Sequence, residues 1–80
     1  MSTRSDAARV RIKAVAANRA AEPGSLEFKA ASSLAAALYV TDNLDRARAL
    51  ITRARHTNPT TRTTALDLLH QLTEEENTTQ

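Results

Sequence analysis

The chain has no cysteine, no tryptophan, one glycine, two prolines and two aromatic residues among its 80 residues. Without cysteine it cannot form a disulfide or a cysteine-based zinc site. His56 and His70 alone make a poor metal site, so we expect no metal and no cofactor. A single glycine excludes the glycine-rich loops that bind phosphates. At this length the chain forms at most one domain, and a monomer buries only about 60% of its unfolded surface. This shortage favours association with a second copy, most simply as a homodimer, or with a larger partner.

Long apolar runs are also missing. No segment approaches the roughly 20 apolar residues that are needed to cross a bilayer. The N-terminal residues lead into a charged, alanine-rich stretch that does not have the apolar segment of a signal peptide. Together with the lack of cysteine, this predicts a cytoplasmic protein that has no contact with a membrane.

The net charge of +2 conceals an uneven distribution of charge along the chain. Residues 1–21 carry five basic residues and one acidic residue, and residues 41–62 carry five basic and two acidic residues. Residues 63–80 carry four acidic residues and neither Lys nor Arg. The basic part could form a surface for nucleic acid. It could equally be the body of a protein that ends in a solvated acidic tail.

Helical periodicity runs through the chain, and signals for strands are missing. We predict an all-α fold of three to four short helices. The first covers about 6–21, the second begins near Leu26 with Ser25 as its cap, and the third follows Asp42, which we predict as its cap. Pro59 separates the third helix from a fourth that begins between residues 59 and 64.

The apolar residues of these segments define the predicted core and the limits of the domain. Leu34, Leu38, Leu44 and Ile51 are the predicted core residues, and Leu50 belongs to the same buried stripe of the third helix. Residues 1–72 form the predicted helical domain. Residues 73–80 form a predicted disordered acidic tail, because Glu74 and its neighbours would meet the negative end of a helix dipole.

The central part of the chain has a recognisable spacing of small and large residues. Ala31, Leu34, Ala35 and Leu38 are followed by Ala47, Ile51, Ala54 and Pro59, and Ala65, Leu68, Leu69 and Leu72 recur 34 residues after the first four. In this respect residues 28–61 resemble a tetratricopeptide repeat. The resemblance implies a central antiparallel hairpin of two helices that cross at their alanines.

The resemblance also implies a binding face. Members of the family bind peptides on a concave face, and the positions that would line it here are Lys29, Ser32, Ser33, Ala36 and Tyr39. It therefore implies a protein–protein interaction module, or adaptor, that self-associates or docks on a larger partner. Ordinary surface positions remain the alternative interpretation of these residues.

Basic residues at helical spacing support a second hypothesis, in which the protein is a small regulator that binds DNA or RNA. Arg9 and Lys13 share a face of the first helix, and the pairs Arg46–Arg53 and Arg48–Arg55 are each separated by seven residues. Such faces can neutralise phosphates. An aromatic platform for stacking single strands is lacking, and a solvated arginine-rich face is the alternative.

Residues at catalytic spacing are missing from the sequence. His56 and His70 have no carboxylate or nucleophile positioned to work with them, and the threonines at 60–64 are better interpreted as capping and surface residues. We therefore expect that the chain is not an enzyme and has no small-molecule substrate.

Overall fold

The computed structural model describes residues 4–54 and 58–78, and within them the protein consists of four α-helices and no strand. The helices are α1 (Arg4–Ala20), α2 (Leu26–Val40), α3 (Leu44–Arg53) and α4 (Pro59–Thr78). The predicted all-α fold is confirmed. No helix in the described ranges combines the length and the apolar character that crossing a membrane requires.

Short polar connections fix where α2 and α3 begin. The Ser25 hydroxyl accepts a hydrogen bond from the Phe28 amide at 3.1 Å, so the predicted cap of α2 is confirmed. Gly24, which precedes it, has a φ of +84°, a left-handed conformation that glycine adopts without strain. At α3 the prediction is wrong by one residue. The cap is Asn43, whose Oδ1 accepts from the Arg46 amide at 3.0 Å, and Asp42 precedes it.

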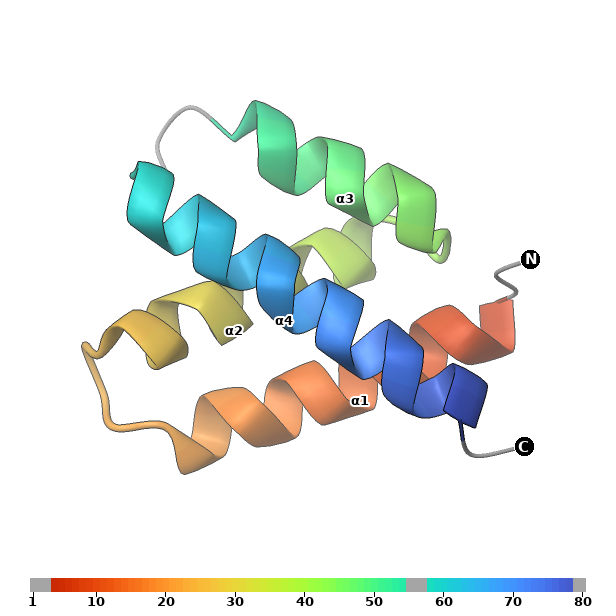
Figure 1. Cartoon of the computed structure of the whole chain (residues 1–80), viewed down its shortest axis with the longest axis horizontal. Helices are drawn as coiled ribbons and strands as arrows, with labels where there is room; N and C mark the ends of the chain where they lie inside the picture. The colour runs from red at the N-terminus through yellow and green to blue at the C-terminus, as the bar shows by residue number, and fades with distance from the viewer. Residues whose placement is uncertain (1–3, 55–57, 79–80) are drawn as a thin grey trace.

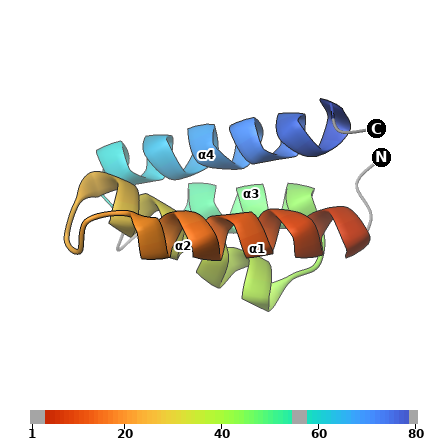
Figure 2. The same ribbon diagram turned by 90° about the horizontal axis from the view of Figure 1, so that it is seen from below.

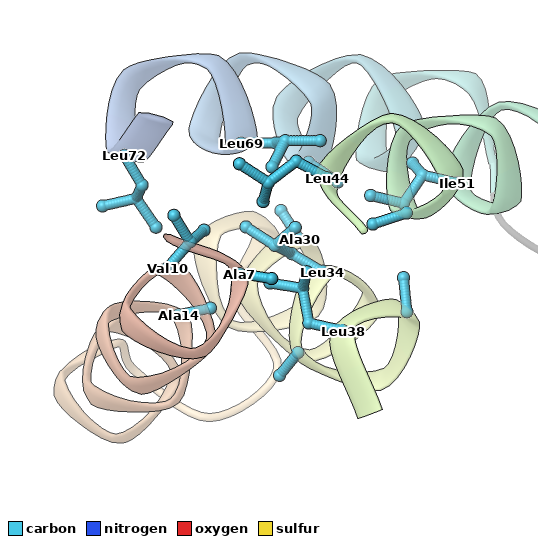
Figure 3. Packing of buried hydrophobic residues seen from close by; sticks show 14 residues of the cluster. Ala7, Val10, Ala14, Ala30, Leu34, Leu38, Leu44, Ile51, Leu69 and Leu72 are labelled. Carbon is cyan, nitrogen blue, oxygen red and sulfur yellow. The ribbon is translucent and has the colours of Figure 1, made fainter. Parts of the chain in front are cut away.

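Helix α2 lies at the centre of the fold, because it packs against each of the other three helices. Helix α1 runs antiparallel beside it, and α4 lies across both (Figures 1 and 2). Helix α3 packs against α2 and α4 on the side away from α1. Helices α1 and α3 lie diagonally opposite each other and make only marginal contact (Figure 3).

One hydrophobic cluster joins the four helices (Figure 3). Its largest fully buried side chains are Val10, Leu34, Ile51 and Leu69, one from each helix. The predicted core residues are confirmed, since all four are at most 6% exposed: Leu34, Leu38, Leu44 and Ile51. Within each helix, apolar residues three and four positions apart share one face. The core forms where these faces, from helices distant in sequence, pack together.

The end of α4 differs from the sequence prediction, which placed a disordered tail from residue 73. The helix continues to Thr78. Lys13 of α1 donates a hydrogen bond to Glu76 at 3.4 Å, and the Glu76 side chain is only 9% exposed. The Thr73 hydroxyl donates to the Leu69 carbonyl at 2.7 Å. A cation from another helix thus offsets the unfavourable end of the dipole. Residues 79–80 lie outside the described residues.

Candidate functional site

A groove of about 610 Å³ lies between α2 and α3 and ends at the first turn of α4. Helix α2 forms one wall, the second half of α3 forms the other, and residues at the start of α4 close the end. We call this feature the α2–α3 groove. Its lining residues within the described ranges are Phe28, Lys29, Ser32, Ser33, Ala36, Ala37, Val40, Leu50, Ile51, Ala54, Asn58 and Thr61.

The groove exposes apolar side chains to solvent. Val40 at the end of α2 is 75% exposed, and Leu50 on α3 is 39% exposed. The sequence analysis assigned Leu50 to the buried stripe of α3, which is wrong. On that helix Leu44, Ala47 and Ile51 are buried under α2 and α4, whereas Leu50 lies at the edge of the buried face and reaches the groove. Exposed apolar side chains on two facing helices can contact an apolar partner.

Residues at the start of α4 make the end of the groove polar. The Asn58 Oδ1 accepts from the Thr61 amide at 2.8 Å and so caps the helix. One of the Arg62 amino groups (Nη2) donates to the Ala54 carbonyl at 3.0 Å, which ties α4 to the end of α3. Thr61 is only 5% exposed, although a surface position was predicted. Its hydroxyl has no hydrogen-bond partner among the described residues.

The structure brings together four of the five residues that were predicted as the partner-binding face. Lys29, Ser32, Ser33 and Ala36 all line the α2–α3 groove. Tyr39 is separate from them: it lies on the side of α2 that faces α1, is 67% exposed, and stacks under the Arg11 guanidinium, 5.0 Å from the ring centre. The predicted face therefore has a physical counterpart that does not include Tyr39.

The basic residues of the second hypothesis lie on α1 and α3, two helices that make only marginal contact. Arg9 on α1 is exposed, and Lys13 is bonded to Glu76. On α3, Arg46, Arg48 and Arg53 are all exposed. Arg55 and His56 lie outside the described residues. Helices α1 and α3, which carry these residues, lie diagonally opposite each other across the core (Figure 3).

Two of these arginines share a stripe of α3 with Leu50, which lines the α2–α3 groove. Arg46, Leu50 and Arg53 are at positions i, i+4 and i+7 of α3, so they form one stripe along the helix. Leu50 lines the groove, and the two arginines flank it along that stripe. Together with Lys29 on the opposite wall they form what we call the basic rim: Lys29, Arg46 and Arg53. None of the described lining residues is acidic.

In the described ranges, the histidine that could contribute to a metal site is His70. His70 is exposed and its Nε2 lies 4.0 Å from a Glu74 carboxylate oxygen, a surface pair at i and i+4. No group of three histidine or acidic side chains there is placed to hold an ion.

Sequence reasoning missed the contributions of α3 and α4 to the groove. Val40 and Leu50 have the spacing of ordinary helix residues, and no local signal showed that both would face an open groove. Asn58 and Thr61 reach it only because α4 packs back against α2 and α3. For Leu50 the sequence contained one usable signal, its position between Arg46 and Arg53 on the same stripe of the helix. An apolar residue on a charged stripe lies at the edge of the buried face and not at its centre.

Comparison with protein-family models, with curated proteins and with solved structures gives no match for this chain. The resemblance of residues 28–61 to a tetratricopeptide repeat therefore stays an interpretation of the sequence.

Proposed function

We propose that the chain is a protein-interaction module, or adaptor, that binds an apolar segment of another protein in the α2–α3 groove. The observation that carries the proposal is the exposure of Val40 and Leu50 on facing walls of a groove of about 610 Å³. The lack of cysteine suits a reducing compartment, and we propose that the module works in the cytoplasm.

The energetic argument begins with the exposed apolar side chains. Covering apolar surface contributes roughly 25 cal/mol per Å² that is removed from water. An 80-residue chain buries a smaller fraction of its surface on folding than a large domain does, so each apolar side chain that stays exposed is a notable loss of stabilisation. A segment that places its own apolar side chains against Val40 and Leu50 would remove both surfaces from water at once. The groove is therefore a natural position for a binding partner.

The α2 wall of the groove is suited to close approach. Ser32, Ser33 and Ala36 follow one another along α2 and all line the groove, and their side chains are small. Small residues let the backbone of an incoming segment come near the helix, which increases the number of van der Waals contacts. The two serine hydroxyls can also donate to, or accept from, polar groups of that segment.

A second candidate function, binding of DNA or RNA, is favoured by one observation. Arg46, Arg48 and Arg53 are all exposed on the ten-residue helix α3. Neutralisation of phosphates by such residues makes affinity fall steeply as salt increases. This reading leaves the exposed Val40 and Leu50 without a role, because phosphates gain nothing from apolar contacts.

The test first selects peptides that bind the chain and then measures whether a substitution that fills the groove weakens their binding. Peptides are selected from a random library displayed on phage, with the full chain as the target. Their affinity is then measured for the wild type and for Ala36→Trp, which places a large ring in the groove at an exposed helix position. Ala16→Trp is the matched control, because Ala16 is exposed on α1 and does not line the groove.

We expect Ala36→Trp to weaken binding at least tenfold, which corresponds to about 1.4 kcal/mol, and Ala16→Trp to leave it unchanged. On titration with peptide, the amide resonances of Ser32, Ser33 and Ala36 should shift in NMR spectra of the labelled chain. Failure to select any peptide, or equal effects of the two tryptophans, would refute the proposal. Tight, salt-sensitive binding of duplex DNA that is lost in an Arg46→Glu variant would favour the second candidate.

A further inference from the structure

The one charged side chain among the described lining residues of the α2–α3 groove is basic, and two further basic residues share a stripe of α3 with a lining residue. Lys29 lines the groove from α2, and Arg46 and Arg53 flank Leu50 on α3. All three are exposed, and no described lining residue is acidic. An occupant thus meets apolar surface at Val40 and Leu50 and positive charge at the basic rim.

We propose that the occupant of the groove is an amphipathic α-helix of another protein, with large apolar residues on one face and acidic residues at the edges of that face. This inference rests on the proposed function and specifies the partner's chemistry. The apolar residues would cover Val40 and Leu50. The acidic residues would lie within reach of Lys29, Arg46 and Arg53.

The shape of the groove favours a helix as the occupant. Its α2 wall extends from Phe28 to Val40, a rise of about 18 Å or roughly three turns. Helices that bind in grooves present apolar residues at i, i+3, i+4 and i+7, which span about two turns and fit within that length. On its other sides α2 is already packed against α1 and α4. A helix in the groove would add a further helix–helix contact of the kind that already builds this fold.

The acidic end of this chain cannot fill its own groove. Thr61 closes the groove, and Glu74 lies thirteen residues further along the same helix, about 20 Å away. The α4 end of a second copy also fits poorly. It offers carboxylates, but its apolar residues Leu69 and Leu72 are at most 6% exposed, and Leu66 and Leu68 are partly buried against the core. The exposed Ile12 of a second copy lies between Arg11 and Lys13, whose charge the basic rim would repel. The proposed occupant is for these reasons a different protein.

Charge reversal on the basic rim tests the inference separately from the proposed function. The double variant Lys29→Glu/Arg53→Glu reverses two rim charges at exposed positions. Arg19→Glu is the control, because Arg19, like Arg53, is an exposed basic residue in the last turn of its helix and does not line the groove. Circular dichroism and thermal melting establish that the variants fold as the wild type does. The probes are the selected peptides, measured at two salt concentrations, and a random-sequence DNA duplex.

We expect the selected peptides to be acidic and amphipathic and to gain helical circular dichroism on binding. Each exposed charge pair contributes up to about fivefold in affinity, so the double variant should lose between about twofold and about 25-fold, and Arg19→Glu should lose nothing. High salt should reduce the difference between wild type and double variant.

Several results would overturn the inference. Suppose that Ala36→Trp blocks binding, but that the selected peptides are neutral or basic, or bind the double variant as tightly as the wild type. This result would refute an acidic helix as the occupant and would leave the proposed function of the groove intact. Peptides that bind without gaining helix would refute the helical occupant alone. If neither Ala36→Trp nor the double variant affects binding, both proposals fail. A dimer in light scattering that the double variant dissociates would identify a second copy as the occupant. DNA binding that only the double variant abolishes would assign the rim to nucleic acid.

Discussion

Truncation of Leu34 tests the core of the fold, and its cost can be worked out from the structure. Leu34 is fully buried on the helix that packs against all three others, and its side chain lies within the cluster of Figure 3. Leu34→Ala removes three carbon atoms and leaves a cavity that neighbours from several helices would have to fill. Such changes cost about 2–5 kcal/mol, a large part of the roughly 5–15 kcal/mol that stabilises a domain.

The control for this prediction is Leu26→Ala on the same helix. Leu26 is 37% exposed, so the substitution removes the same atoms but opens no closed cavity, and we expect a loss of about 1 kcal/mol. For a chain of this size each kcal/mol lowers the melting temperature by about 4–8 °C. Leu34→Ala should therefore melt at least about 8 °C below the wild type.

The assay is thermal unfolding followed by circular dichroism at 222 nm, together with urea unfolding to obtain the free energy at one temperature. If Leu34→Ala and Leu26→Ala lower the melting temperature equally, or if Leu34→Ala lowers it by only a degree or two, the assignment of this face of α2 to the core is refuted.

Three further predictions concern the cap of α3, the end of α4 and self-association. Asn43→Ala should lower the free energy of unfolding by about 1 kcal/mol, because the cap of α3 is lost, whereas Asn43→Ser should retain most of it in urea unfolding; equal losses would contradict the capping role. Lys13→Ala should cost up to about 1 kcal/mol at low salt and less at high salt, and should speed amide exchange in the last turns of α4, because Glu76 loses its partner. Unchanged exchange would show that the pair does not hold this end. The predicted homodimer would form through α1 or the exposed side of α4, and in either case the melting temperature should rise over about a hundredfold range of protein concentration. If α1 is the contact, Ile12→Asp, at a 65% exposed position, should abolish the rise; a monomeric mass with a concentration-independent melt would refute the dimer.

The candidate site was partly foreseen in the sequence. Lys29, Ser32, Ser33 and Ala36 were selected as one face because they share a side of a helix, and the structure places all four along one groove. Tyr39 was selected on the same basis but lies towards α1, where Arg11 stacks on it. Spacing along a helix assigns residues to a face approximately. For a residue at the edge of that face, the neighbouring helix that packs beside it determines whether its side chain belongs to the face.

The sequence by itself determined the helices and most of the core. Leu34, Leu38, Leu44 and Ile51 could be identified because apolar residues three or four apart share one face, and Ser25 could be identified as a cap because its hydroxyl satisfies a free amide nearby. These are local effects, which depend on residues within a turn or two.

Only the tertiary structure decided which apolar residues stay exposed and where the chain's distant parts meet. Val40 and Leu50 line a groove because α1 and α4 cover the other sides of α2. Glu76 can be largely buried near the end of α4 because Lys13, sixty-three residues earlier in the chain, donates a hydrogen bond to it. Periodicity within one helix states which residues share a face, but the element that covers that face comes from elsewhere in the chain, and packing among all four helices determines it.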